Sequence, residues 1–497
     1  MRGGSSGGPL GTSMSVRSTV DDGHAMVDAA RERLHELDTG SIIDLTLNWL
    51  QRQPDDGFDW YKRMPFIAFL IIKWAAELWD EGLEGRRPAT GEDFDFIANS
   101  LWEANGRLVS PLPRSIGIRR MAFQQFWYQR YFDVGSLPRQ ALIFGRHLES
   151  SEVSEAFEGQ YGMSPTALVR QLMRMCAQLG NLFNRPALQA LSPRPRESDD
   201  AEWGAMRAAI MVDLPTLHAR MRAIADRSAP RDLELCEQSP LIRCPVLVTP
   251  RGDQVIHHQL LYRCMETALY DLMRAQNAER FMRHFGPAFE AYLAEVLGEL
   301  DAQVIRETEL KQRLIGRGKC VDFAVVSDDI LLLVDAKGIE GHYDELYHSL
   351  PDVLTAKLRT TALHATDQAV ETVQRLPEDL RRRTTVFLCV TFKQLNIGDG
   401  EALRDLTTGT DEHAHGRWSE PSLPPSQMFY PSVSEFEHLC GAVRAGVPLG
   451  GLLRRIILDN QSPETSCLLL SQHLARLGEV NIPDCAANAA RELCGLD

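Results

Sequence analysis

The chain of 497 residues contains no long apolar segment and no pair of cysteines at C-x-x-C spacing. Its longest apolar run, Met64–Trp79, is interrupted by Lys73 and is too short to span a bilayer, so we expect a buried core helix and no membrane partner. No secretory segment is recognisable ahead of the ten cysteines, which favours free thiols in a reducing cytoplasm.

Several catalytic motifs are also missing. The sequence has no P-loop, no G-x-G-x-x-G, no G-x-S-x-G and no H-E-x-x-H, which argues against a built-in ATPase motor or a serine hydrolase. Positive charge is in short supply, because 53 Lys and Arg face 68 Asp and Glu and the formal net charge is -15. That balance argues against non-specific coating of nucleic acid but leaves room for one local basic track.

Hydrophobic periodicity predicts a mostly α-helical, multidomain chain with one α/β region. The Gly- and Ser-rich start indicates an expression-tag remnant or a disordered tail. We expect five segments: the tail over 1–24, a helical recognition or regulatory domain over 25–235, an α/β domain over 236–400, a loop over 401–430 and a C-terminal helical region over 431–497.

The α/β region is predicted from short β-branched runs that alternate with helical stretches. Predicted helices cover about 257–300 and 343–376, and predicted strands or extended segments cover 244–250, 321–326, 330–335 and 386–392.

The two runs on either side of Asp328 and Asp329 predict a β-hairpin that is apolar on both faces and therefore buried between layers. With a two-residue turn at that pair, Ser327 lies opposite Ile330, and five steps further Asp322 lies opposite Asp335. Directly opposed residues share a face, with Cβ atoms about 5 Å apart. A slip of one residue would turn Asp322 to the other face.

Two opposed carboxylates repel each other unless a cation lies between them. Mg²⁺ binds through a few carboxylate oxygens together with water and substrate phosphate. Asp335 and Lys337 point to the same side of their strand, so the predicted end of the hairpin holds two acids and one base. The arrangement is typical of a divalent metal site; without a metal, Lys337 would serve as the pairing cation.

Asp322, followed after twelve residues by Asp335-Ala336-Lys337, resembles the signature of PD-(D/E)XK nucleases. Val321 stands where the usual proline would be. The resemblance covers roughly 280–395 and implies a restriction-endonuclease-like mixed sheet flanked by helices. It also implies an upstream helix that supplies Glu290, with Glu295 as the alternative, and a later helix that supplies Gln368, with Gln374 as the alternative.

The resemblance further implies Mg²⁺ or Mn²⁺ held by Asp322, Asp335, Glu290 and the Ala336 carbonyl, with Lys337 orienting the attacking water. Two basic groups could contact phosphates: the one between Arg306 and Lys319, and Arg381-Arg382-Arg383. His342 and His348 are expected to be ordinary surface or core histidines.

The expected partner is nucleic acid, with DNA favoured over RNA, and cleavage of both strands would suit a homodimer. By analogy of architecture, the helical regions would restrain a prokaryotic antiviral effector until a trigger such as a protein binds. Three alternatives stay open: an RNA-cleaving enzyme, a catalytically inactive nuclease-like scaffold, and a helical interaction protein in which the hairpin is an insert.

Overall fold

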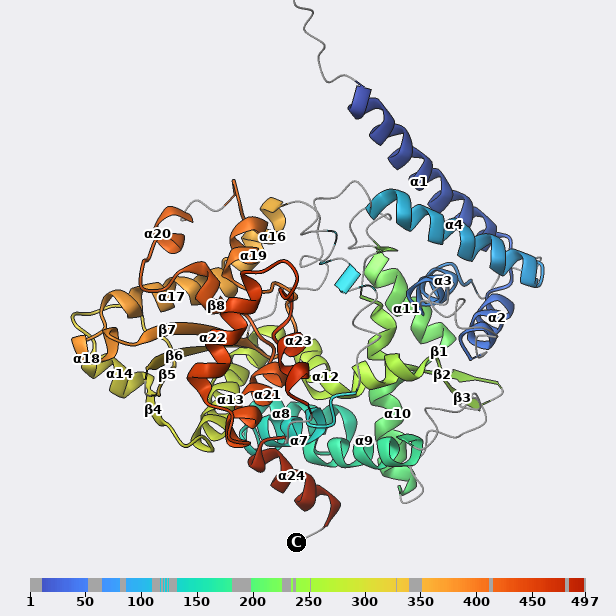
Figure 1. Ribbon diagram of the computed structural model, residues 1–497. Helices are drawn as coiled ribbons and strands as arrows, with labels where there is room; N and C mark the ends of the chain where they lie inside the picture. Colours follow the sequence, from blue (N-terminus) through green and yellow to red (C-terminus); the bar gives the residue numbers. More distant parts are fainter. Residues whose placement is uncertain are drawn as a thin grey trace, which may run out of the picture. The chain divides into compact units, whose positions relative to one another are not determined.

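The computed structural model describes residues 11–51, 65–80, 86–109, 117, 119, 121–122, 124, 132–180, 198–225, 234–235, 238–250, 252–327, 329–338, 351–410, 414–478 and 482–495. The described chain is mostly helical and contains two small mixed sheets (Figure 1). It divides into two compact units. Unit 1 comprises 1–130, 182–192 and 211–261, and unit 2 comprises 131–181, 193–210 and 262–497. No described helix is both long and apolar enough to cross a membrane.

Unit 1 is a set of helices with a three-stranded sheet in the order β1-β2-β3, parallel between β1 and β2 and antiparallel between β2 and β3. Helix α4 begins at a cap in which Thr90 N donates to Asp93 Oδ2 at 3.0 Å. The described elements are α1 (Gly11–His35), α2 (Thr39–Gln51), α3 (Pro65–Glu77), α4 (Gly91–Val109), β1 (Met211–Asp213), α11 (Leu214–Ala225), η5 (Pro240–Arg243), β2 (Val246–Thr249) and β3 (Gly252–Val255).

Unit 2 holds the second sheet and the helices around it. Before the sheet come α7 (Ser136–Gln140), η2 (Ala141–Arg146), α8 (Glu152–Tyr161), α9 (Pro165–Gly180), α10 (Asp200–Ile210), most of α12 (His258–Gln276) and α13 (Ala278–Gly298). Within and after it come β4 (Gln303–Arg306), α14 (Glu307–Arg313), β5 (Phe323–Val326), β6 (Ile330–Lys337), α16 (Pro351–Leu358), α17 (Ala362–Gln374), α18 (Glu378–Arg381), β7 (Thr384–Thr391), α19 (Gly400–Leu406), α20 (Ala414–Trp418), η6 (Pro425–Gln427), β8 (Met428–Phe429), α21 (Val433–Arg444), α22 (Leu449–Asn460), α23 (Leu470–Leu474), η7 (Ala475–Leu477) and α24 (Asp484–Cys494).

The second sheet has the order β4-β5-β6-β7-β8. The pairs β4–β5 and β5–β6 are antiparallel, whereas the pairs β6–β7 and β7–β8 are parallel. In Figure 1, α17 lies above this sheet and α13 below it, and both helices contact β6. Helices on both sides explain why the central strands are apolar on both faces: β6 is buried from Ile330 to Asp335.

Helix α13 packs against the end of β6 through an aromatic cluster. The Phe285 ring stacks on Phe281 and Phe289 and meets Tyr270 and Phe392 edge-on. Gly338 follows β6 at this place, and a Cβ atom there would lie 2.7 Å from Phe285 Cδ1. Only glycine therefore allows the strand end to approach the helix so closely.

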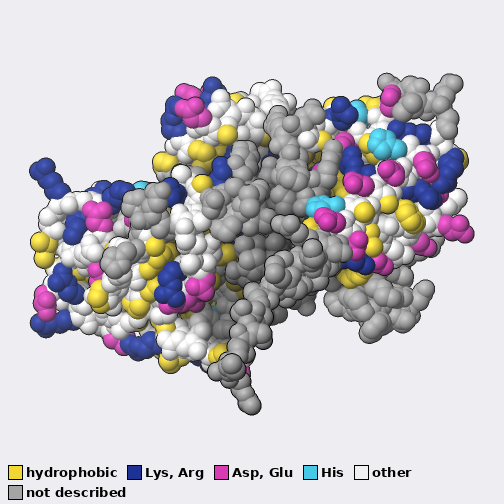
Figure 2. Space-filling model, turned by 90° about the horizontal axis from the view of Figure 1, so that it is seen from above, with side chains coloured by type: hydrophobic (Ala, Val, Ile, Leu, Met, Phe, Trp, Pro, Cys, Tyr) yellow, Lys and Arg dark blue, Asp and Glu magenta, His cyan; other side chains and the backbone are white. Residues whose placement is uncertain are grey.

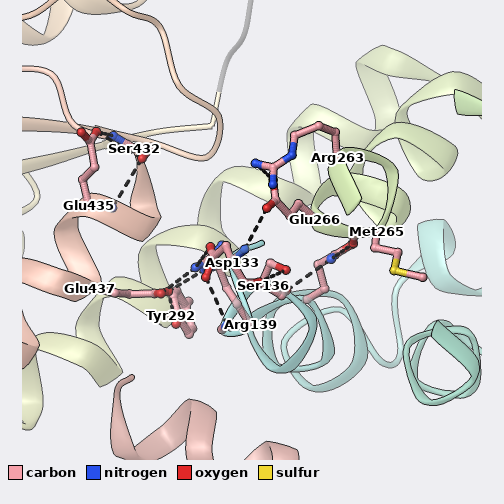
Figure 3. Close-up of polar contacts among 12 residues, drawn as sticks. Asp133, Ser136, Arg139, Arg263, Met265, Glu266, Tyr292, Ser432, Glu435 and Glu437 are labelled. Carbon is pink, nitrogen blue, oxygen red and sulfur yellow. Dashed lines mark hydrogen bonds and ion pairs between the residues drawn. The ribbon is translucent and has the colours of Figure 1, made fainter. Parts of the chain in front are cut away.

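A buried polar network also fixes α13 (Figure 3). Arg139 Nη2 lies 2.6 Å from Glu437 Oε2 and 2.8 Å from Asp133 Oδ2, and the Tyr292 hydroxyl donates to Glu437. These groups come from α7, α13, α21 and the segment before α7. A buried charge pair is tolerated when its remaining hydrogen-bonding capacity is met in this way.

The structure corrects several expectations about elements. Helix α1 spans Gly11–His35 and so begins inside the segment interpreted as a tail; its later residues Val27, Ala30 and Leu34 are buried. The stretch expected as one helix over 257–300 breaks at Asn277, whose side chain caps α13 by accepting from Arg280 N.

The expected loop over 401–430 contains α19, α20, η6 and β8. Its composition is rich in turn-forming residues, which predicts a loop. Two interactions nevertheless stabilise regular structure there: Asp399 caps α19 by accepting from Ala402 N, and β8 pairs with β7. The segment at 244–250 does contain a strand, β2, but this strand belongs to the three-stranded sheet of unit 1. The C-terminal region after 431 is helical, as predicted, and belongs to the same unit as the larger sheet.

Candidate active site

The hairpin adopts the register on which the site depends. Phe323 pairs with Val334 and Val326 pairs with Leu331, and Ser327 N donates to Ile330 O at 3.0 Å. One further step along both strands places Asp322 opposite Asp335. The short link between the two strands limits the choice of register, and pairing with β7 on its other side holds β6 in place. The predicted register is confirmed, while Asp328 lies outside the described residues.

Asp335 is the most deeply buried acid of the site. Its side chain has no exposed surface, and no described residue donates a hydrogen bond to its Oδ1 atom. Lys337 Nζ lies 2.6 Å from Asp335 Oδ2 and donates to Gln368 Oε1 at 2.7 Å. Burial, together with the neighbouring Asp322 carboxylate, raises the pKa of Asp335 to about 8. Burial alone would lower the pKa of Lys337, but the Asp335 carboxylate raises it above its ordinary value.

Asp322 is half-buried at the start of β5. Its Oδ2 atom accepts from Ala336 N at 2.7 Å, which ties the two strand ends together. Burial raises the pKa of Asp322, although the hydrogen bond from Ala336 opposes that shift. The described contacts of Ala336 at the site are made through its N–H, and its expected role as a carbonyl ligand stays a prediction.

Glu290 belongs to α13, the helix that contacts β6. Burial raises the pKa of Glu290, and the nearby Asp322 carboxylate raises it further. Its alternative, Glu295, instead lies 3.2 Å from His147 Nε2 and 3.7 Å from Arg146 Nη1. The structure therefore favours Glu290 over Glu295 as the upstream acid.

Gln368 joins the site to the loop that precedes Asp322. Its Nε2 atom donates to Cys320 O at 3.1 Å, while its Oε1 atom accepts from Lys337. Its alternative, Gln374, donates to Glu420 at 3.1 Å and makes no described contact with the site residues. The assignment of the glutamine to Gln368 is thus supported by geometry.

The two basic groups lie at opposite ends of the sheet. Arg306 pairs with Phe323, beside Asp322, so the 306–319 group is at the site. Thr384 pairs with Ile330, so the three arginines before it are about five residues, roughly 17 Å, from Asp335. Arg383 donates to the Ser327 carbonyl, and Arg382 pairs with Glu378 at 3.2 Å. Arg381-Arg382-Arg383, expected as a second group that could contact phosphates, therefore lies at the end of the sheet away from Asp335.

Two residues at the site were not singled out from the sequence. His364 precedes Gln368 by one helical turn, and burial followed by the charges of Lys319 and Lys337 lowers its pKa. Glu307 begins α14 and is close enough to raise the pKa of both Asp322 and Glu290. The i, i+4 spacing from Gln368 is the one signal that could have pointed to His364. His342 and His348 lie outside the described residues.

The fit of this site to a divalent metal rests on the carboxylates. The described residues contain no group of three His, Cys, Asp or Glu side chains arranged to hold a metal ion. Mg²⁺ needs fewer protein ligands, since one or two carboxylates with water and substrate phosphate suffice. The buried Asp335 Oδ1 atom without a hydrogen-bond donor, opposite Asp322, is the observation that fits a cation.

Comparisons with protein-family models, with curated proteins and with solved structures find no match for this chain. Its function is therefore inferred from its own residues.

Proposed function

We propose that the chain is a metal-dependent nuclease that hydrolyses phosphodiester bonds, with DNA as the substrate. The observation that carries the proposal is the hairpin register, which places Asp322 opposite Asp335 with Lys337 two residues further on. Glu290 and Gln368 approach the same place from helices on either side of the sheet. A chance acid-x-Lys at a strand end would not also bring Asp322, Glu290 and Gln368 to the same place.

Asp322 and Asp335, with Glu290 beside them, would hold Mg²⁺ or Mn²⁺. When bound, the metal supplies Lewis-acid polarisation of the scissile phosphate and a water of lowered pKa. The chain's own residues do the rest. Asp335 would be ionised when the metal is bound, and its negative charge would then lie in a dry environment, where its interactions are stronger than in water.

Lys337 keeps its proton, because the Asp335 carboxylate raises its pKa. Its ammonium group is therefore able to orient a water molecule and to stabilise negative charge that develops on the phosphate. Gln368 fixes the direction of that ammonium group through its Oε1 atom and is itself held by the Cys320 carbonyl. Gln368 acts as a positioning residue.

The ion pair between Lys337 and Asp335 also favours a second candidate, a nuclease-like fold without activity, because a metal-free protein would keep this pair. Cleavage distinguishes the two. Plasmid DNA, single-stranded DNA and RNA are incubated with Mn²⁺, Mg²⁺ or EDTA and wild-type protein, Asp335→Ala or Lys337→Ala. We expect metal-dependent cutting of DNA that both substitutions abolish.

If no substrate is cut, calorimetric titration with Mn²⁺ separates the remaining cases. Binding that is lost in Asp322→Asn and Asp335→Asn indicates an enzyme held inactive until a trigger arrives, as proposed for a prokaryotic antiviral effector. Absence of binding indicates the inactive scaffold. Cutting of RNA alone would replace the proposed substrate and keep the proposed site.

A further inference from the structure

The segment between α14 and Asp322 forms a small exposed loop, Ile315-Gly316-Arg317-Gly318-Lys319, which we call the basic loop. It leads directly into the site, because Asp322 comes three positions after Lys319 and the chain between them spans at most about 10 Å. Figure 2 shows Lys and Arg side chains, mixed with acidic ones, at the left end of the view, the side on which α14 and α18 lie in Figure 1.

The backbone of the basic loop is held by α17. Arg375 donates to three of its carbonyl groups: Lys319 O at 2.7 Å, Gly316 O at 3.1 Å and Ile315 O at 3.3 Å. In return, Ile315 N donates to Arg375 O at 2.9 Å, and Lys319 N donates to Glu371 Oε1 at 2.9 Å. Five hydrogen bonds on one short loop fix its shape before any partner arrives, which lowers the entropic cost of binding.

Two glycines permit this conformation. Gly316 has a φ of 80°, in the left-handed region that favours glycine. A Cβ atom at Gly318 would overlap the Glu371 carboxylate and lie 2.8 Å from Arg375 Nη1. Because the backbone polar groups turn inward to α17, the side chains of Ile315, Arg317 and Lys319 turn outward and are exposed.

The basic loop carries one exposed apolar side chain and two exposed cations. Ile315 is 65% exposed, next to buried Leu314. On α14, Lys311 and Arg313 pair with Glu307 and Glu309, whereas no described residue forms an ion pair with Arg317 or Lys319. The loop therefore presents one exposed apolar side chain followed by two cations that have no ion-pair partner among the described residues, in a chain whose net charge is -15.

We propose that the basic loop binds the minor-groove edge of duplex DNA and positions one strand at Asp322 and Asp335. Cations that contact phosphates, beside an exposed apolar side chain, suit the narrow minor groove, into which proteins insert such side chains as wedges. Single-stranded nucleic acid would instead call for aromatic stacking side chains, and the segment 306–319 contains none. The proposal rests on the proposed function for its substrate class, but its test requires no cleavage.

Binding is measured by fluorescence anisotropy with the full-length chain in EDTA and a labelled duplex DNA of about 24 base pairs, over a salt series. Two phosphate contacts predict that Arg317→Ala/Lys319→Ala makes the slope of log K against log salt less steep by about 1.8. With equal affinities of wild type and variant at 1 M salt, this difference in slope makes DNA binding by the variant about 60-fold weaker than by wild type at 0.1 M salt.

Gly318→Ala keeps both charges and changes only the loop's conformation, so weaker binding by that variant assigns the effect to the shape of the loop. The charge-matched control is Arg454→Ala/Arg455→Ala on α22, where Arg454 pairs with Asp329 at the turn end of the hairpin. Circular dichroism and thermal melting show whether each variant is folded. Equal DNA binding by wild type, the loop double variant and Gly318→Ala would overturn the proposal, and so would tighter loop-dependent binding of duplex RNA or of single strands than of duplex DNA.

Hydrolysis of bis(p-nitrophenyl) phosphate with Mn²⁺ separates this proposal from the proposed function, because so small a diester does not extend from the site to the loop. We expect Arg317→Ala/Lys319→Ala, which leaves the backbone hydrogen bonds of the loop in place, to hydrolyse it at the wild-type rate and Asp335→Ala not to hydrolyse it. Hydrolysis without loop-dependent DNA binding refutes the loop alone. Loop-dependent DNA binding without phosphodiester cleavage, and without Mn²⁺ binding that depends on Asp322 and Asp335, refutes the nuclease and keeps the loop.

Discussion

Replacing Gly338 by alanine tests how the end of β6 is seated against α13. The added Cβ atom would lie 2.7 Å from Phe285 Cδ1, about 0.7 Å closer than an ordinary contact of about 3.4 Å. Phe285 has little freedom to move, because it is fully buried between Phe281 and Phe289. We expect overpacking to cost about 2 kcal/mol in the free energy of unfolding.

The same displacement should reach the site, since Lys337 precedes Gly338 directly. A shift approaching 1 Å in a reacting group lowers the rate by up to about 100-fold, so cleavage should fall more than stability alone explains. Urea unfolding followed by circular dichroism measures the stability; with a slope of about 3 kcal/mol per M, the midpoint falls by about 0.7 M.

The matched control is Gly298→Ala, at the far end of the same helix, where nothing lies within 4 Å of an added Cβ atom. This change should leave the urea midpoint unchanged or raise it, because alanine is the better helix former. Phe285→Leu combined with Gly338→Ala should recover part of the stability by relieving the close contact. The reasoning is refuted if Gly338→Ala and Gly298→Ala are equally stable and equally active.

Three further substitutions test the site and the fold, and the first two have a matched control residue. Gln368→Ala should lower kcat about 10- to 100-fold in single-turnover cleavage, because Lys337 loses its second partner, whereas Gln374→Ala should have wild-type kcat; equal rates would remove Gln368 from the site. Glu290→Gln should weaken Mn²⁺ binding in calorimetric titration while Glu295→Gln should not, and the opposite result would move the upstream acid to the alternative. Asp93→Asn should cost about 2 kcal/mol of stability at neutral pH, because two arginines and Thr90 hold the pKa of Asp93 well below its usual range. A carboxyl with a lowered pKa contributes its full share to the free energy of unfolding above its unfolded-state pKa, and this share is lost as the pH falls through the folded-state pKa. Wild type should therefore lose stability below about pH 4, and Asp93→Asn should lose less. Acid titration of the unfolding of each protein measures the difference.

The hairpin could be predicted from the sequence because two independent constraints coincide there. The strands are apolar on both faces, which identifies them as buried, and the short link between them leaves little choice of turn. Strands β4 and β8 were missed because they are only four and two residues long and carry no alternation of their own. Their positions are decided by pairing with β5 and β7, which no local pattern encodes.

The basic groups show where sequence proximity misleads. Arg381-Arg382-Arg383 come directly before a strand of the site sheet, and so do the cations of 306–319. Which end of the sheet each group reaches depends on strand direction: β7 runs parallel to β6, so its start lies at the turn end of the hairpin, whereas β4 ends beside Asp322. Parallel and antiparallel pairing cannot be distinguished from the residues of one strand alone.

One face of α17 connects the chemistry to the surface that we propose binds DNA. Gln368 contacts Lys337, Glu371 contacts Lys319 N, and Arg375 contacts three carbonyls of the basic loop. These positions, with His364 before them, recur every three or four residues and so lie along a single stripe of the helix. A movement of the basic loop would be transmitted to α17 through five hydrogen bonds and would change where Gln368 holds the Lys337 ammonium group. Binding of the correct partner at the loop and orientation of the catalytic lysine are therefore expected to be energetically coupled.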